Sequence, residues 1–494
     1  MQLLMMLYLV AMCSFIPLYM KQGYYELGEA KGICYIAVSL CFFMLFIFVY
    51  IISIRKKAAP TLPKTEFTGA SPIKLCLYAT ILSGIISFIF SADKKTAFWG
   101  IEGWRNGLLS LLLMVIFSLI LSNLKRLPVW LMCLVMLVPA FEFVLGIINR
   151  FGIYFAVPGR GNAGYLATIG NINWYAGFLS VFLPLGIGIM YVQKPFSRLF
   201  FISGLYAIPG IVTLFLQGSD GAFLIVLSSY LMLLFYSLSA PDSTLLRKWL
   251  IQIFVLGMGM SIADIMVSLF AQMYTYDSNY LVRVIHVHIG IIIMAAAFFL
   301  YNLVRLLDEI NVSFKGAIVR KALLIVLLLL SLAGIYLVAV NFSDEFGNGR
   351  GMIWRMCTGV FLGLSPWEKM VGVGRDCLYP YVINNPLWRE TFLNVFDGDI
   401  LTNAHCELLT VLIESGLIGV CAYLGLFISI FIDVFRVKER ENAAIVCALP
   451  IISYFVFSQT SFSQVTATPY VYILIGMYLA FSGKRNSGQL GDGN

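Results

Sequence analysis

The chain has few charged residues. Asp, Glu, Lys and Arg make up 12% of its 494 residues, whereas hydrophobic types make up 60%. A soluble domain has about a quarter charged residues, so this composition excludes a soluble protein and predicts one that crosses a membrane many times. The net charge of +8 does not indicate a nucleic-acid partner, because the basic residues lie in short connections between apolar runs.

Metal and redox motifs are also lacking. The ten cysteines include no CxxC pair, and most lie in apolar runs, where a thiol behaves as a small apolar group. Of the three histidines, His286 and His288 are two residues apart on a predicted helix, so we expect them to face different ways and to share no metal. The sequence predicts neither a metal ion nor a cofactor.

A cleavable signal peptide is not indicated. The first apolar run, residues 3–18, has no basic segment before it and no A-x-A site after it. We expect this run to be kept as a membrane helix.

The chain is rich in long apolar runs. About fourteen of them are long enough to cross roughly 30 Å of hydrocarbon. They predict an all-α, polytopic membrane protein that forms one integral-membrane domain over residues 1–494, with spans centred near Val10, Phe43, Leu82, Ile116, Val135, Leu183, Ile208, Ser229, Gly259, Ala295, Leu330, Phe427, Tyr454 and Ile475.

The basic residues predict the orientation. With the N-terminus inside, about twenty of the 33 Lys and Arg residues fall in the short inner connections, a density near threefold that of the other side. We therefore expect a multi-pass protein of a bacterial inner (plasma) membrane, with both termini cytoplasmic.

One polar segment interrupts this pattern. Residues 341–404, between the eleventh and twelfth runs, carry five basic residues and end just before His405. Unpaired backbone polar groups cost several kcal/mol each in lipid, so the segment must lie outside the bilayer. Loops of this length are usually functional, and we expect an extracytoplasmic active site here.

Within this segment, residues 354–364 are amphipathic and predict a helix on the membrane surface, with Arg355 as an anchor. Arg350 precedes that helix and is freer to bind a ligand. Cys357, Cys377 and Cys406 share the same outer loop, where a disulfide between two of them is conceivable.

His405 opens the next apolar run. Asn403 fits an N-cap, which would place His405 in the first helical turn, where the positive helix end keeps the imidazole neutral and able to accept a proton. The alternative is a solvated histidine at a helix start. Glu407 would point away from His405 and share a stripe with Glu414.

Any acid that orients His405 must come from elsewhere, such as Asp397 or Asp399. The Asp-Gly-Asp sequence at 397–399 is similar to the metal–nucleotide motif of soluble glycosyltransferases, but it would face outward, where nucleotide sugars are not available.

Two arginines stand out in other outer segments. Arg160 lies in a glycine-containing stretch at 158–162, where its planar guanidinium suits phosphate oxygens; the alternative is a contact with lipid headgroups. Arg283 and His286 share one helix face near the outer surface, either beside a site or in an ordinary packing position.

Four stretches together resemble the O-antigen ligase and Wzy-type polymerase superfamily of membrane glycosyltransferases. They are residues 100–109, which resemble the family's G…R..GLL segment; Arg160 with residues 170–176, which resemble R…GN.N..A; residues 350–354 with Pro366 and 372–374, which resemble R…W…P..GVG; and residues 404–419, which resemble HNE.L…E.GL.G.

The resemblance implies a GT-C-like helical fold and metal-independent transfer of a glycan from a polyprenyl (undecaprenyl) diphosphate carrier to a glycan or glycolipid acceptor. It implies that Arg160 and Arg350 bind the diphosphate, and that His405 is the general base. Membrane lipid is the other expected partner.

The chain departs from the family pattern at two positions. Asp220 stands where the family has an arginine, and Cys406 stands where it has an asparagine after the histidine. Further site residues implied by the resemblance are Arg105, Arg283 and Arg375, any of which could supply the missing diphosphate contact, with Asn171, Asn173, Asp399 and Glu407 in secondary positions.

Two other classes of protein remain open. A polysaccharide flippase also has twelve to fourteen spans, but it normally has short loops and charges along a central cavity, whereas here Glu142 and Asp264 are among the few ionisable residues deep in spans. A receptor or sensor would need neither Arg160 nor His405 for glycan assembly.

Overall fold

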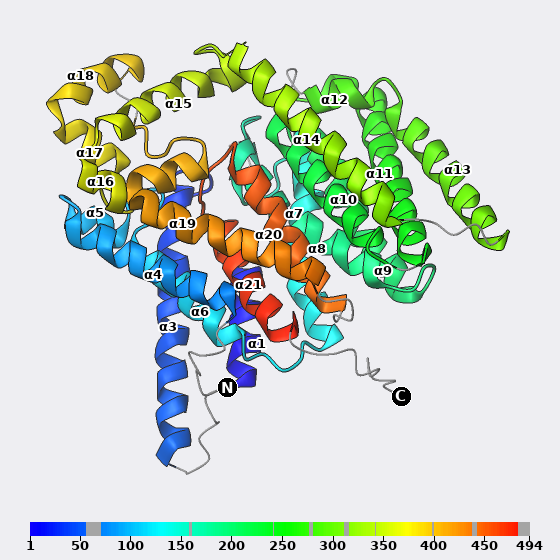
Figure 1. Cartoon of the computed structure of the whole chain (residues 1–494), viewed down its shortest axis with the longest axis horizontal. Helices are drawn as coiled ribbons and strands as arrows, with labels where there is room; N and C mark the ends of the chain where they lie inside the picture. The colour runs from blue at the N-terminus through cyan, green and yellow to red at the C-terminus, as the bar shows by residue number, and fades with distance from the viewer. Residues whose placement is uncertain are drawn as a thin grey trace.

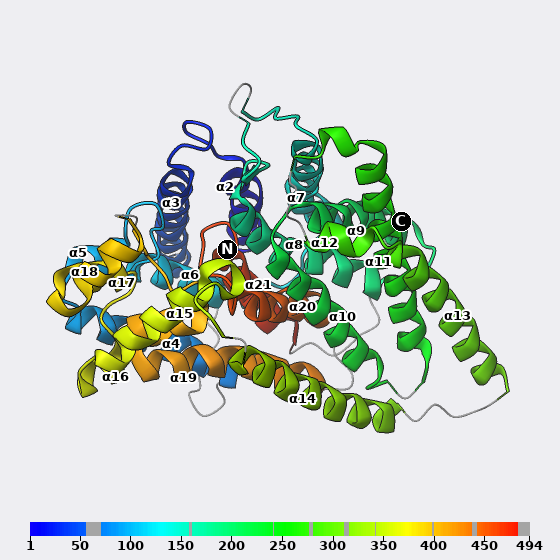
Figure 2. The same ribbon diagram turned by 90° about the horizontal axis from the view of Figure 1, so that it is seen from above.

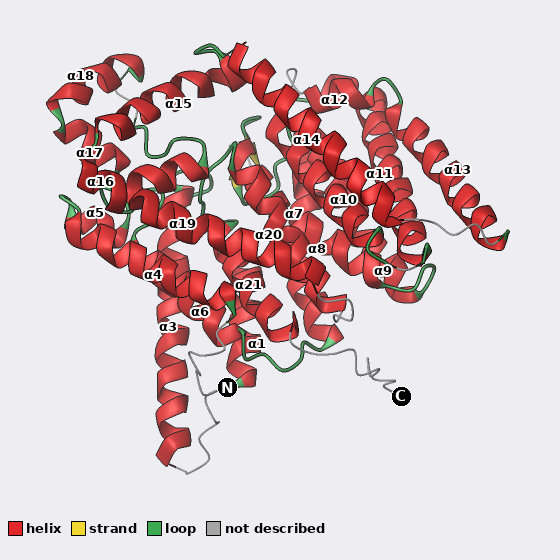
Figure 3. Ribbon diagram, in the orientation of Figure 1, coloured by secondary structure: helices red, strands yellow, loops and turns green. Residues whose placement is uncertain are grey.

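The computed structural model describes residues 1–55, 71–157, 161–240, 242–275, 280–310, 316–340, 342–397, 400–436 and 442–482. These residues are almost entirely helical, and the short strands β1 (Tyr165–Leu166) and β2 (Gly170–Asn171) pair with each other. Figure 3 shows the helices crowded together, with the short strand pair near the middle. The described part of the chain is therefore an all-α membrane protein, as predicted.

Each predicted apolar centre falls inside a helix. The helices that contain the centres are α1 (Gln2–Val10), α3 (Leu27–Arg55), α4 (Pro72–Phe90), α6 (Leu108–Leu121), α7 (Val129–Arg150), α8 (Ile172–Val192), α9 (Arg198–Leu216), α10 (Phe223–Ser237), α11 (Thr244–Leu269), α13 (Ile289–Glu309), α14 (Gly316–Val340), α19 (Glu407–Arg436), α20 (Asn442–Ser458) and α21 (Thr468–Ser482). Within the described ranges, nine helices are long and apolar enough to cross a membrane.

Short elements connect these helices. A π-helical turn η1 (Ala11–Phe15) and α2 (Ile16–Leu18) continue α1, while α5 (Lys94–Trp99), η3 (Asp220–Ala222), η4 (Ala271–Met273) and α12 (Tyr280–Ile285) lie between longer helices. Helix α19 is broken at Gly416, whose backbone is in a left-handed conformation with φ of 65°.

Helix α8 lies at the centre of the bundle. It packs against α9 and α20, and α21 packs against α20 and α6. Helix α8 is also the most buried of the candidate spans. In Figure 1 helices α9, α11 and α13 form one side of the molecule, and α3 extends beyond the rest of the bundle. Figure 2 shows α14 along one edge of the molecule.

The predicted polar loop is folded into helices. They are α15 (Phe346–Gly363), α16 (Pro366–Val371), α17 (Leu378–Asn384) and α18 (Pro386–Val395), which together form a lobe beside α4, α5 and α19 (Figures 1 and 2). The lobe has an apolar core of its own, which includes Cys357, Val360 and Phe392 and is completed by Ala97 of α5 and Ile413 of α19. The predicted surface helix begins earlier than expected, so Arg350 lies within α15 and not before it.

Contacts join segments that the charge pattern assigns to the same side. Among inner segments, the side-chain amide of Gln2 donates to the Asn123 carbonyl at 2.8 Å, and Arg247 lies 3.7 Å from Asp308. Among outer segments, Asn106 donates to the Ser463 carbonyl at 3.0 Å. The helix order is therefore internally consistent with alternate crossings.

Candidate functional site

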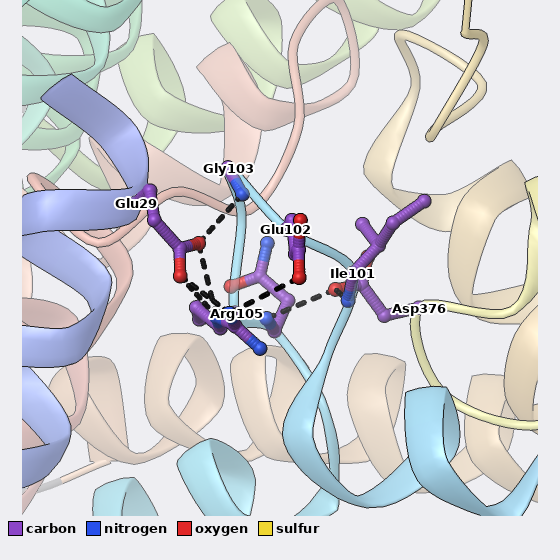
Figure 4. Close-up of polar contacts among 7 residues, drawn as sticks. Glu29, Ile101, Glu102, Gly103, Arg105 and Asp376 are labelled. Atoms are coloured by element: carbon purple, nitrogen blue, oxygen red, sulfur yellow. Dashed lines mark hydrogen bonds and ion pairs between the residues drawn. The ribbon is translucent and has the colours of Figure 1, made fainter. Parts of the chain in front are cut away.

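The loop between α5 and α6 is shaped by glycines and held by two carboxylates (Figure 4). Arg105 has a left-handed backbone with φ of 52°, and its Nε donates to both carboxylate oxygens of Glu29 at 2.9 Å. The Gly103 N–H donates to the same carboxylate at 2.8 Å. Arg105 is thus engaged within the protein, and a diphosphate would have to compete with Glu29 for it.

Asp376 joins this loop to the lobe. Its Oδ2 accepts from the backbone N–H groups of Ile101, at 2.8 Å, and Asn106, at 3.1 Å (Figure 4). Burial raises the pKa of the Asp376 carboxyl to about 6, against the opposing effect of these hydrogen bonds and of Arg375. Two stretches that are more than 250 residues apart in sequence therefore meet through one buried side chain.

The lobe meets α19 through backbone contacts that only glycine permits. The N–H groups of Val373 and Gly374 donate to the Ile413 and Glu414 carbonyls, each at 3.1 Å. A Cβ on Gly372 would lie 2.2 Å from the Glu414 oxygen, and a Cβ on Gly416 would lie 2.3 Å from the Met370 oxygen. The predicted GVG and ESG stretches are thus in direct contact.

Arg375 lies at a cluster of buried carboxylates. Its Nε donates to the Asn106 carbonyl at 3.3 Å, and it lines two small cavities together with Glu407. One cavity, of ≈ 20 Å³, also contains Asp376 and Glu414 in its wall. That volume admits about one water molecule, so Arg375 is part of an internal polar cluster without room for a diphosphate.

Glu407 lies on the same side of α19 as Glu414, as predicted. Its Oε2 accepts from the Ser463 N–H at 2.6 Å, and its side chain is 6% exposed. The second cavity, of ≈ 40 Å³, extends from Arg375 and Glu407 along hydroxyl groups of α19, α20 and α21, including those of Ser415, Tyr423, Tyr454 and Thr468.

His405 lies just before α19 and not in its first turn. The helix begins at Glu407, and His405 has a left-handed backbone with φ of 48°. Asn403 accepts from the His405 N–H at 3.1 Å, whereas the predicted N-cap would accept from a residue inside the helix. The predicted N-cap and first-turn position are therefore wrong, because the chain turns sharply before the helix starts.

The prediction of a neutral imidazole agrees with the structure, but for a different reason. Burial and the nearby positive charge of Arg350 lower the pKa of His405 to about 4, so the ring is uncharged at pH 7. Within the described residues, no hydrogen-bond partner of the ring nitrogens is present. Asp397 does not orient the ring, and Asp399 lies outside the described residues.

Arg350 and Arg283 lie near Asp220. Burial lowers the pKa of Arg350, and the Asp220 carboxylate opposes that effect. Among the described residues, the Arg350 guanidinium has neither a hydrogen bond nor an ion pair within 4.0 Å. Arg283 is exposed and packs its guanidinium 5.1 Å from the Tyr280 ring. Arg350 therefore acts electrostatically on both Asp220 and His405.

The two asparagines of the predicted site have structural partners. Asn171 is the N-cap of α8, because its side chain accepts from the N–H groups of Asn173 and Trp174, each at 3.0 Å. Asn173 accepts from the Ser219 hydroxyl at 3.0 Å, next to Asp220. Arg160 lies outside the described residues.

The structure contradicts the expected separation of His286 and His288. Their Nδ1 atoms contact the two oxygens of Asp264 at 2.9 and 2.7 Å. The helix ends before them and His288 has φ of 56°, so the helical spacing that predicted divergent side chains does not apply. No group of three or more metal-binding side chains is present among the described residues.

Cys357, Cys377 and Cys406 are free thiols, so the conceivable disulfide is not present. Burial raises the pKa of Cys357 and Cys377 to about 12, which leaves both thiols protonated and unreactive.

Sequence reasoning missed the connection between α20 and α21, residues 459–467. Its Phe462 contacts the His405 ring, and its Ser463 contacts both Glu407 and Asn106. The polar residues of this stretch were visible between two apolar runs, but its partners lie 56 or more residues away in the chain.

Comparison of the chain with protein-family models, with curated proteins and with solved structures found no match.

Proposed function

We propose that this chain is a membrane glycosyltransferase that moves a glycan from a polyprenyl diphosphate carrier to an acceptor sugar on the outer face of the membrane. The observation that carries the proposal is the pairing of an unprotonated His405 with an Arg350 that has no described hydrogen-bond or ion-pair partner. A neutral base with a cation near enough to act on it suits a reaction that removes a proton and releases an anion.

The convergence of the motif stretches supports the same proposal. Residues 100–107 lie more than 250 positions before residues 372–376 and 404–416, but the three stretches contact one another through Asp376, Gly372 and Gly416. With fourteen crossings and the inside-positive orientation, these stretches would share the outer side with the lobe, in a GT-C-like arrangement.

In the proposed reaction, the acceptor hydroxyl gives its proton to a ring nitrogen of His405 while its oxygen attacks the anomeric carbon of the donor. The bond between that carbon and the diphosphate oxygen breaks, and its electron pair leaves with the carrier diphosphate beside Arg350. His405 then passes its proton to solvent. A bound diphosphate offsets the charge of Arg350, so donor binding raises the pKa of His405 toward the range in which a base is effective.

The flippase alternative predicts charges that face a transport path. Instead, the Glu142 carboxylate accepts from the Thr168 N–H at 3.0 Å, and Asp264 is held by two histidines. Intramembrane charges with local partners favour a structural role for these residues, and therefore favour an enzyme over a transporter.

The test is a transfer assay with purified protein, a lipid-linked oligosaccharide and candidate acceptors. We expect a product ladder for a polymerase or a single addition for a ligase, and loss of transfer in His405→Asn and Arg350→Gln. Arg389→Gln, an exposed arginine of the lobe, serves as the control that keeps activity. In cells, loss of His405 should leave carrier-linked glycans on the outer side; accumulation on the inner side would instead identify a flippase.

A further inference from the structure

Among the described residues, no side chain or carbonyl makes the polar contact that usually fixes a catalytic imidazole. An acid or carbonyl bound to one ring nitrogen normally sets the orientation of the other. The described residues supply no such partner, although the backbone of His405 is fixed by its left-handed turn and by Asn403. Something else must hold the ring if it is to act at one position.

Within the described part of the chain, an aromatic side chain contacts the ring. The centroids of His405 and Phe462 lie 5.1 Å apart, with the ring planes at 86°. Edge-to-face pairs of this kind are favourable beyond the apolar area that they bury. Phe462 is 4% exposed, so it also keeps water from one side of the imidazole.

Phe462 is itself held from several directions. Its ring meets Trp104 at 4.9 Å and 90°, and Trp104 packs on Trp174 of α8 at 5.1 Å. The next residue, Ser463, is fixed through its N–H by Glu407 and through its carbonyl by Asn106. An aromatic series therefore runs from the central helix α8 to the imidazole.

We propose that Phe462 is the positioning residue of His405, taking the place of the carboxylate that would otherwise orient the base. An edge-to-face aromatic contact restricts the plane of the imidazole and excludes water on that side without a hydrogen bond to either ring nitrogen. The contact between Phe462 and His405 is present in the structure, whereas its importance for catalysis rests on the proposed function.

Histidine NMR of the full chain in lipid nanodiscs tests the positioning directly. With only three histidines, ¹³C-histidine labelling gives three sets of signals, and His405→Asn assigns one of them. We expect the wild-type His405 to titrate near pH 4, and Phe462→Ala to raise that midpoint by about one unit or more as water enters. Phe462→Tyr should restore it. Unchanged His286 and His288 signals show that each variant is folded.

Phe392→Ala is the matched control, because Phe392 lies in the lobe core and is also 4% exposed. It removes the same amount of buried aromatic surface but should leave the His405 midpoint where it was. The proposal is wrong if Phe462→Ala leaves the midpoint unchanged, or if Phe392→Ala moves it as far.

The transfer assay then tests whether the contact between Phe462 and His405 is needed for catalysis. Phe462→Ala should lower kcat by about tenfold to hundredfold with KM within about twofold, because a misplaced base slows chemistry without weakening donor binding. Phe462→Tyr should recover most of kcat. A rise in KM with kcat unchanged would overturn the positioning role. If wild-type protein transfers no glycan while the NMR result stands, the proposed function fails and the positioning of the ring does not.

Discussion

At the scale of single residues, burial and the positive charge of Arg350 both lower the pKa of His405, although no hydrogen bond joins the two side chains among the described residues. The positive guanidinium opposes a second positive charge on the imidazole, and burial acts in the same direction. The sequence predicted a neutral histidine from a helix terminus, but the backbone turn at His405 removes it from that terminus. The predicted charge state agrees with the structure although its reason was wrong, because both causes, burial and the nearby Arg350, depend on the tertiary fold.

The pH dependence of His405 follows from this pair. Arg350→Gln removes the nearby cation, so the pKa of His405 should rise from about 4, and protonation should begin at higher pH. Histidine NMR measures the midpoint directly, and Arg389→Gln should leave it unchanged. In the transfer assay, kcat/KM of the wild-type protein should stay constant down to the pH at which free His405 protonates. A midpoint that falls in Arg350→Gln would contradict the assigned sign.

Arg105 offers a second test at this scale. If its role is the ion pair with Glu29, then Arg105→Gln and Glu29→Gln should each destabilise the protein by about 1–3 kcal/mol, and the double variant by little more than either one. Thermal unfolding in detergent measures the three changes. A large rise in donor KM for Arg105→Gln, without one for Glu29→Gln, would show instead that Arg105 contacts the donor.

At the scale of elements, the long apolar runs predicted the positions of the helices correctly. Every predicted centre lies in a helix because a run long enough to cross lipid must satisfy its backbone internally. The lobe was not foreseen as four helices, because its short helices are defined by caps and local turns, such as the Ser365–Glu368 capping box of α16. The role of residues 459–467 could not be read from sequence, because it depends on partners brought close only by tertiary packing.

The contact between the lobe and α19 gives a prediction about glycine. Gly372→Ala places a Cβ at φ of 81° and 2.2 Å from backbone, so it should cost several kcal/mol and lower Tm markedly. Gly349→Ala is the control, because Gly349 has φ of 83° but open space around its Cβ position. Gly349→Ala should therefore lower the free energy of unfolding by only about 1 kcal/mol, the cost of the left-handed backbone alone. Equal losses of Tm in the two variants would show that the close contact is not present in solution.

At the scale of the whole molecule, the lobe and the inner helix connections lie on opposite sides of the bundle if the helices cross alternately. Alkaline phosphatase fused after Val395 should therefore be active, and a green fluorescent protein fused after Ser482 should fluoresce, since each reporter works only in its own compartment. The reverse pattern would place His405 and Arg350 in the cytosol and remove the basis of the proposed donor.

The paired glycines at 372 and 416 have one mechanical consequence. Because backbone lies on backbone there, we expect residues 407–415 of α19 and the lobe to move together as one rigid body, with the break at Gly416 as the hinge. Spin labels at the exposed Trp367 and the half-buried Leu412 should keep a constant separation when a substrate is added, while the separation from Trp367 to the exposed Phe431, beyond the break, changes. A bulky glycan of the proposed donor would then enter by a tilt of this rigid body, and the loops around the imidazole would stay folded.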